Sequence, residues 1–159
     1  MIHGDGNKGN LNLLFNIVNT GVPWLLGAFR NKRSFLSIDN LNFIIREILI
    51  KDIPSGAYFL SDDKPVSINS LIKIIAASVS KNIIIVKIPK FIIRSFAFIG
   101  DFINLPINSE RLKKLTENYV VDNTEILKIL NKSLPLTSEE GLKKTFKTLI
   151  KKKAWKELY

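Results

Sequence analysis

The chain of 159 residues contains no cysteine. It therefore forms no disulfide, offers no thiol nucleophile and builds no zinc–thiolate site, a composition that fits a reducing cytoplasm. His3 is the one histidine, which excludes a metal site made of several histidines. The sequence suggests no catalytic partner for His3, and we expect this side chain to be buried or at an edge of the fold.

Long apolar runs are also missing. The most apolar region, 83–103, is interrupted by charged residues, Pro89 and Gly100, whereas a membrane-spanning helix needs about 20 predominantly apolar residues. The first ten residues contain no apolar segment of the kind that secretory signals use. We therefore expect no membrane span and predict a cytoplasmic location. A hydrophobic content of 46% is still enough for a packed core in one domain.

Acidic residues are scarce, with 14 against 24 basic ones and a net charge of +10. Seven lysines lie between Lys143 and Lys156, so residues 1–142 carry a net charge of only +4. We interpret these lysines as a solvated helix end. The alternative is a weak attraction to nucleic acid or to an anionic membrane.

Sequence motifs for catalysis are lacking as well. The glycines between Gly4 and Gly9 suggest a phosphate-binding loop, but no strand is predicted before them, and a dinucleotide-binding fingerprint requires a strand–turn–helix context. The loop either simply turns or directs the start of the next helix toward a phosphate or nucleotide. No tyrosine begins a Tyr-x-x-x-Lys sequence, and nothing indicates a Ser-His-Asp triad.

Apolar periodicity predicts an α/β fold in which helices alternate with short strands. Helices are predicted over 10–20, from Ser67 to Val79 and from Pro89 to Ile103. Another is predicted to begin at a cap on Asp39, with an apolar stripe formed by Leu41, Ile44, Ile45, Ile48 and Leu49. Two more should follow the capping boxes Asp122-x-x-Glu125 and Thr137-x-x-Glu140. Strand candidates are 33–38, 57–60, 119–122 and the β-branched run 83–88, which we expect to be buried on both faces. The first helix has no predicted strand before it, as in a piece of a larger α/β protein.

A cluster of cations, Arg30-Asn-Lys-Arg-Ser34, precedes the first strand candidate. An arginine at the start of a strand can present a rigid fork to phosphate oxygens. A basic surface turn explains the same residues equally well, so both interpretations remain open at this point.

The ordered segments resemble a known family. The segments IHGDG, GNL, NKRSFLSIDNL, GAYFLSD, VSINSL, YVVDNT and SEEGL are similar in order and spacing to the C-terminal half of NAD-dependent nucleotide-sugar epimerases and dehydratases. These belong to the extended short-chain dehydrogenase/reductase family, and the likeness is closest to UDP-hexose and UDP-N-acetylhexosamine 4-epimerases. The resemblance implies a partial family fold without its N-terminal Rossmann half. Residues 1–145 would be the substrate-binding domain, and 146–159 a lysine-rich helix end or tail.

The resemblance implies that substrate binding and catalysis belong to different halves of the enzyme. In this family the N-terminal half carries the cofactor fingerprint and the Tyr-x-x-x-Lys pair, so this chain is expected to hold no cofactor and no catalytic residue. It would bind a UDP-sugar, while NAD would serve the complete enzyme. The implied partners are a separate Rossmann half and a homo-oligomer, with no nucleic acid. The alternative function is a non-enzymatic basic module that contacts nucleic acid or an anionic membrane through its lysine-rich tail.

Family roles transfer to four residues. Asn10 matches the asparagine that contacts the nucleotide diphosphate at a helix start, and Leu11 follows it against the base. Arg33 matches the arginine that pairs with the diphosphate, and Arg111 lies near a second arginine that contacts phosphate or ribose. The sequence departs from the family at HGDG, where relatives have Tyr-Gly-Pro-Gly, and at 130–135, where relatives have Leu-Gly-Trp-x-Pro.

Overall fold

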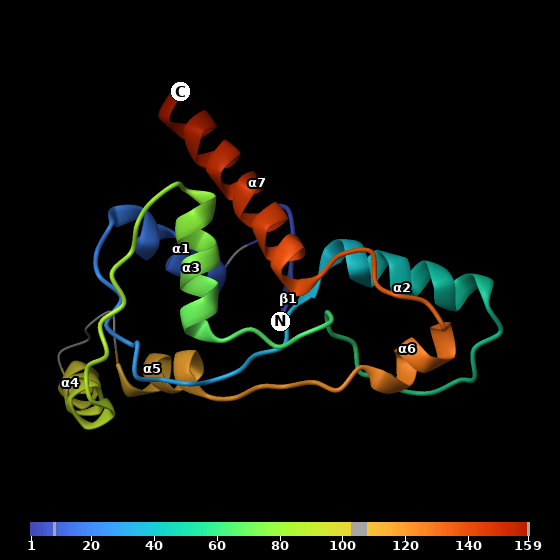
Figure 1. The fold of residues 1–159 in the computed structure, drawn as a ribbon, viewed down its shortest axis with the longest axis horizontal. Coiled ribbons are helices and arrows are strands. Elements are labelled where there is room, and N and C mark those ends of the chain that lie inside the picture. The colour runs from blue at the N-terminus through green and yellow to red at the C-terminus, as the bar shows by residue number, and fades with distance from the viewer. Residues whose placement is uncertain (8, 103–107, 159) are drawn as a thin grey trace.

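The computed structural model describes residues 1–7, 9–102 and 108–158. Within these ranges the chain forms β1 (Ile2–His3), α1 (Asn10–Thr20), β2 (Leu36–Ser37), α2 (Ile38–Ile50), α3 (Ile68–Ser78), α4 (Lys90–Phe102), α5 (Ser109–Thr116), α6 (Thr124–Leu130) and α7 (Ser138–Leu158). The two strands pair in parallel, Ile2 with Leu36 and His3 with Ser37. The fold is a mostly helical α/β arrangement around a small parallel sheet, and Figure 1 shows the strands between the group of α1 and α3 and the group of α2 and α6.

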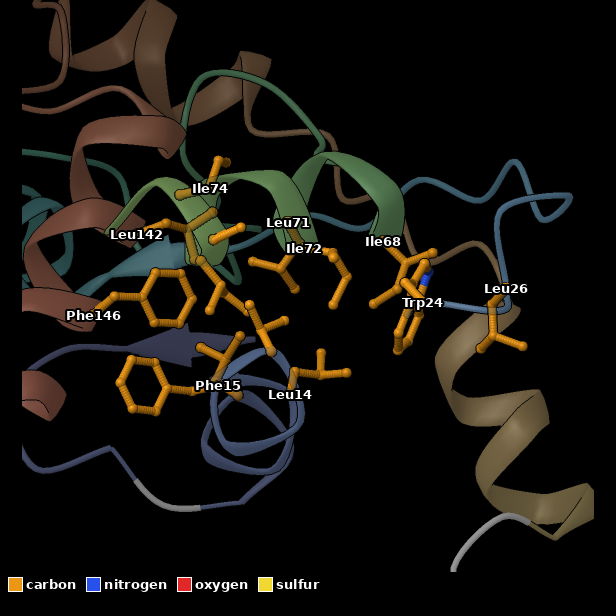
Figure 2. Packing of buried hydrophobic residues seen from close by; sticks show 14 of the residues in the cluster. Leu14, Phe15, Trp24, Leu26, Ile68, Leu71, Ile72, Ile74, Leu142 and Phe146 are labelled. Carbon is orange, nitrogen blue, oxygen red and sulfur yellow. The ribbon is translucent and has the colours of Figure 1, made fainter. Parts of the chain in front are cut away.

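The main core lies where α3 packs against α1 and α7. Ile72 and Ile75 of α3 are completely buried, and their spacing directs both side chains to the same face of the helix. Below them, Phe15 of α1 and Phe146 of α7 stack with ring centroids 6.2 Å apart (Figure 2). Burial of these apolar side chains is the main stabilising contribution, because removal of apolar surface from water drives folding.

A second, smaller core joins α2 to α6. Its buried members are Leu36, Ile44, Ile126 and Leu130. Figure 1 places these helices on the opposite side of the strands from α1 and α3. The chain therefore has two apolar clusters with the small sheet between them.

All six predicted helices are present in the structure. α1 covers the predicted range and ends at Gly21, which adopts φ 81°. The hydroxyl of Ser67 accepts a hydrogen bond from Ser70 N at the start of α3, and α4 follows Pro89. Before α7, Glu140 accepts from the N–H and hydroxyl of Thr137, and the Glu140 N–H donates back, which is the predicted capping box. The described part of the lysine-rich segment continues α7.

The strand predictions were mostly wrong in extent. Segment 57–60 is not a strand, and 33–38 contains only the two residues of β2. Segments 83–88 and 119–122 form isolated bridges at Ile85, Lys87 and Tyr119. Ile84 is 69% exposed, so the β-branched run is not buried on both faces. A β-branched run favours extended backbone, but burial on two faces needs covering layers that the described residues do not supply.

Helix details also needed correction. Ser37, not Asp39, caps α2, because its hydroxyl accepts from Asn40 N. Ile45 and Leu49 of the predicted apolar stripe are exposed. The first capping box does not form as predicted, since the side chain of Asp122 instead accepts from Thr124 N.

Two elements were not predicted at all. α5 has few apolar residues, and only Leu112 of this helix is buried, so its apolar periodicity is weak. The short strand β1 precedes the glycine loop, which contradicts the expectation that no strand comes before α1.

Candidate functional site

The backbone of Arg33 is held between two other chain segments. Its N–H donates to Val66 O at 3.0 Å, and Val66 N donates back at 2.8 Å. On the other side, Ser34 N donates to Tyr119 O at 2.8 Å and Tyr119 N to Lys32 O at 2.9 Å. The side chain of Arg33 therefore starts from a fixed position, which is a condition for aiming a charged group at a ligand.

The guanidinium of Arg33 is oriented by the end of α5. Nη1 donates to the carbonyl of Lys114, and Nη2 lies 4.0 Å from the Glu117 carboxylate. The Arg33 side chain is 22% exposed, whereas Arg30 and Lys32 are exposed residues. A cation is favourable beside the last carbonyls of a helix. A guanidinium has five N–H donors, more than these two contacts use.

Asn31, within the same basic run, has a structural role that sequence reasoning missed. It is buried, and its Nδ2 donates to Leu115 O at 3.1 Å while its Oδ1 accepts from Ile68 N at 3.4 Å. The side chain thus ties the segment before β2 to both α5 and α3. An uncharged residue among three cations was the only sequence signal for this role.

Arg111 projects from the first turn of α5. Asn108 caps this helix, since its Oδ1 accepts from Arg111 N at 2.9 Å. Glu110 and Lys114 pair along the helix surface, and the hydrogen bond from Lys114, together with its charge, lowers the pKa of the Glu110 carboxyl. Because Arg33 Nη1 donates to the carbonyl of Lys114, Arg33 contacts the helix that carries Arg111.

Asn10 and Leu11 lie at the start of α1. Gly9 adopts φ 102° and provides no side-chain cap, while Asn12 Nδ2 donates to Asn7 O at 2.7 Å and closes the loop. Asn10 is exposed, but Leu11 is 0% exposed and belongs to the main core. A ligand at this helix start would therefore meet the N–H of Leu11 rather than its side chain. α1, which carries these two residues, packs on α3, whereas α5, which carries Arg111, packs on α4.

The glycine loop between β1 and α1 has some features of a dinucleotide-binding loop and lacks others. Gly4, Gly6 and Gly9 have the spacing of the fingerprint, and the structure supplies a strand before them and a helix after them. However, the sequence has no acidic residue between Asp5 and Asp39 to bind a ribose hydroxyl. A Cβ at Gly6 or Gly9 would meet nothing within 4 Å, so neither glycine marks a close approach of other protein groups. The residues present do not fit NAD at this loop.

A basic cavity lies between α4 and α5. Its volume is about 190 Å³, and its lining includes Arg94, Ser109, Lys113 and Thr116. Two cations and two hydroxyls around one small space suit an anionic group. Sequence reasoning did not find it, because Arg94 and Lys113 belong to different helices.

A buried polar network surrounds His3, which confirms the expectation of a buried histidine. Its Nδ1 lies 2.9 Å from Thr145 Oγ1, and its Nε2 lies 3.6 Å from Asp62 Oδ2. Asp62 in turn accepts from Ser37 N at 3.0 Å and from Asn40 Nδ2 at 2.7 Å. The side chains of His3 and Asp62 are both 0% exposed, so the network joins β1, β2, α2 and α7 and presents no reactive group to solvent.

The described residues contain no group of three or more His, Cys, Asp or Glu side chains placed to hold a metal ion. In the same part of the chain, no helix has both the length and the apolarity to cross a membrane.

Comparison with known proteins gives similarity at the level of structure. No protein-family model matches the chain, and no curated protein sequence is significantly similar to it. A dTDP-glucose 4,6-dehydratase from Bacillus anthracis str. Ames, solved with NAD, matches with a TM-score of 0.64 at 15% identity, over 100% of this chain and 45% of the dehydratase. A UDP-N-acetylglucosamine 4-epimerase from Bacillus cereus matches with a TM-score of 0.64 at 16% identity, over 94% of this chain and 45% of that one.

A third solved structure contains a substrate. The UDP-glucose 4-epimerase of Thermotoga maritima, solved with UDP-glucose, matches with a TM-score of 0.57 at 16% identity, over 95% of this chain and 44% of the epimerase. At these identities the likeness shows a shared fold. The chain spans less than half the length of each solved protein.

Proposed function

We propose that this chain is the UDP-sugar-binding portion of an NAD-dependent sugar-nucleotide 4-epimerase and corresponds to the C-terminal half of such an enzyme. The observation that carries the proposal is the fold shared over 94–100% of the chain with sugar-nucleotide epimerases and dehydratases. One of these neighbours was solved with UDP-glucose bound. A fold alone does not define a function, so the residues must supply the chemistry.

Arg33 is the residue that best suits this function. Its backbone is held on both sides, its guanidinium is oriented by Lys114 and Glu117, and it is less exposed than Arg30 and Lys32. A guanidinium can hold two diphosphate oxygens at once, which the single ammonium of lysine cannot reproduce. Arg111 on the adjoining helix would add a second cation for phosphate or ribose.

Asn10 would contact the diphosphate at the start of α1, where free helix N–H groups favour an anion. Leu11 would contribute its backbone beside the base. The proposed reaction needs a hydride acceptor and a base, and the sequence has neither a Tyr-x-x-x-Lys pair nor a cofactor loop that fits NAD. The role of this chain is therefore to bind and orient the substrate, with the chemistry supplied by a separate Rossmann half.

Calorimetric titration with UDP tests the proposal. We expect Arg33→Lys to weaken UDP binding about 10-fold and Arg33→Ala up to about 150-fold, the range for losing a charge-assisted hydrogen bond. Arg30→Ala and Lys32→Ala are matched controls, because both remove an exposed cation from the same run. Thermal unfolding of each variant separates lost binding from lost stability. Equal, small effects at all three positions would make Arg33 an ordinary surface cation and contradict the proposed site.

A titration with NAD tests whether cofactor binding and catalysis belong to the separate Rossmann half. The isolated chain should bind no NAD and should not convert UDP-galactose to UDP-glucose. Addition of a Rossmann half that carries the Tyr-x-x-x-Lys pair should restore activity. Turnover by the isolated chain would show that the chemistry resides here after all.

A further inference from the structure

The surface of α4 is unusually apolar for an exposed helix. Its large exposed apolar residues, called the α4 apolar surface below, are Phe91, Phe96, Phe98, Ile99 and Phe102. The exposed fractions of Phe91, Phe98 and Phe102 are 69%, 60% and 74%. Large exposed apolar side chains gathered on one helix in this way favour an interaction site.

The helix has one narrow buried stripe and one narrow charged stripe. Ile93, Ala97 and Gly100, spaced by four and three residues, are the buried residues of α4, which packs against α5. Lys90, Arg94 and the acidic Asp101, all exposed, follow one another along the adjacent stripe. Phe91, Phe98 and Phe102, spaced by seven and four residues, lie on the solvent side, where the Phe98 and Phe102 rings meet edge to face with centroids 5.1 Å apart. Packing against α5 therefore cannot account for the aromatic side chains.

The charge around this surface identifies the kind of partner. Residues 81–116 contain seven basic and two acidic residues, a net charge of +5. Lys87, Lys90 and Arg94 are exposed on or beside α4, and Lys113 of α5 joins Arg94 at the cavity between the two helices. A second copy of the chain would bring the same positive charge against this surface, which is unfavourable. An anionic surface would be attracted to it.

We propose that the α4 apolar surface docks on an anionic phospholipid membrane, with α4 lying in the plane of the interface. Aromatic side chains would enter the boundary between headgroups and acyl chains, and the flanking cations would meet lipid phosphates. The 13 residues of α4 are too few to span a bilayer but enough for an interfacial helix. In Figure 1 the C-terminal end of α7 lies at the top of the view and α4 at its lower left, so a contact through α4 is distinct from one made by the lysine-rich tail.

Vesicle co-sedimentation tests the docking. The full chain should bind vesicles of phosphatidylcholine and phosphatidylglycerol in equal parts, and bind at least about 10-fold more weakly to phosphatidylcholine alone. The triple variant Phe91→Ser/Phe98→Ser/Phe102→Ser keeps every charge, including the tail. We expect it to lower the partition coefficient about 100-fold, because each phenylalanine no longer leaves water.

A matched control comes from the α2 side of the molecule. Leu49→Ser, Ile50→Ser and Phe59→Ser together remove three other exposed apolar side chains and should leave binding unchanged. If the triple Phe variant bound vesicles as strongly as the wild type, the attraction would come from the charged tail and the proposal would be overturned. Equal losses in the two triple variants would also overturn it, since no particular surface would then be responsible.

Fluorescence quenching gives a second measurement that does not depend on a triple variant. Lipids brominated on their acyl chains should quench the fluorescence of the Phe98→Trp variant more than that of the wild type, which contains only the natural tryptophans. The Leu49→Trp variant should show no such additional quenching. Equal quenching at the two positions would contradict docking through α4. The wild type could instead be a dimer that does not bind vesicles and becomes a monomer when the three phenylalanines are replaced. That result would assign the surface to contact with a second copy and overturn the proposal.

Discussion

Replacement of Asp62 by alanine should destabilise the whole fold, because this carboxylate connects its central elements. Both of its oxygens lie within 3.1 Å of Ser37 N at the end of β2, and Oδ1 accepts from Asn40 Nδ2 of α2 at 2.7 Å. Its Oδ2 is 3.6 Å from His3 Nε2, a buried nitrogen that has no hydrogen-bond partner among the described residues. Alanine would remove all of these contacts at once.

The magnitude follows from the individual contacts. A hydrogen bond to a charged group contributes about 1.5–3 kcal/mol, and a buried donor left without a partner costs about 1–3 kcal/mol. Asn40 Nδ2 also donates to Leu136 O, so it keeps one partner after the change. Removal of a buried charge also removes its desolvation cost, which offsets part of the loss. We therefore expect Asp62→Ala to lower the free energy of unfolding by about 3–5 kcal/mol, a large share of the roughly 5–15 kcal/mol typical of a domain.

Urea unfolding followed by circular dichroism measures this effect. Asp62→Asn keeps one acceptor oxygen and should cost about half as much, which keeps the test informative if Asp62→Ala does not fold. Asp52→Ala, at an exposed position, should change stability by less than about 0.5 kcal/mol. A cost below about 1 kcal/mol for Asp62→Ala would refute the argument that this network holds the strands to α2.

Two further predictions concern the start of α7. Gly141→Ala should lower the melting temperature, because the new Cβ would lie 2.8 Å from the Cβ of Ser37. Alanine normally stabilises a helix by about 1 kcal/mol relative to glycine. A raised melting temperature would therefore show that the helix can shift away from Ser37. Asp63 accepts from Ser138 N at 2.7 Å and from Ser138 Oγ at 2.8 Å. Partial burial opposes ionisation of Asp63, but these hydrogen bonds outweigh it and lower the pKa of its carboxyl. A lowered folded-state pKa contributes stability above the unfolded pKa of about 3.9 and loses it as the pH falls through the folded value. The stability difference between wild type and Asp63→Asn should therefore be present at neutral pH, begin to fall near pH 4 and disappear once the pH is below the folded-state pKa. A pH-independent difference in urea unfolding would contradict this linkage.

Residues of the same type in the sequence proved to have different roles in the structure. Arg30, Lys32 and Arg33 are near neighbours with the same charge, yet only the Arg33 guanidinium is oriented by the end of α5. That helix was not predicted, because only one of its residues is buried. His3 was expected to be buried, but its neighbours Asp62 and Thr145 come from distant parts of the chain, so no sequence spacing could identify them.

The helices α1, α3, α4 and α7 were predictable because each depends on local information: apolar spacing, Gly21, Ser67, Pro89 and the Thr137–Glu140 box. A helix satisfies its hydrogen bonds within one segment, so its own sequence specifies most of it. A strand needs a partner from elsewhere, and among the described residues the run 83–88 pairs with the segment opposite it through isolated bridges at Trp24 and Leu26. Burial likewise depends on what other segments cover, which is why Asp62 lies inside while Phe98 lies outside.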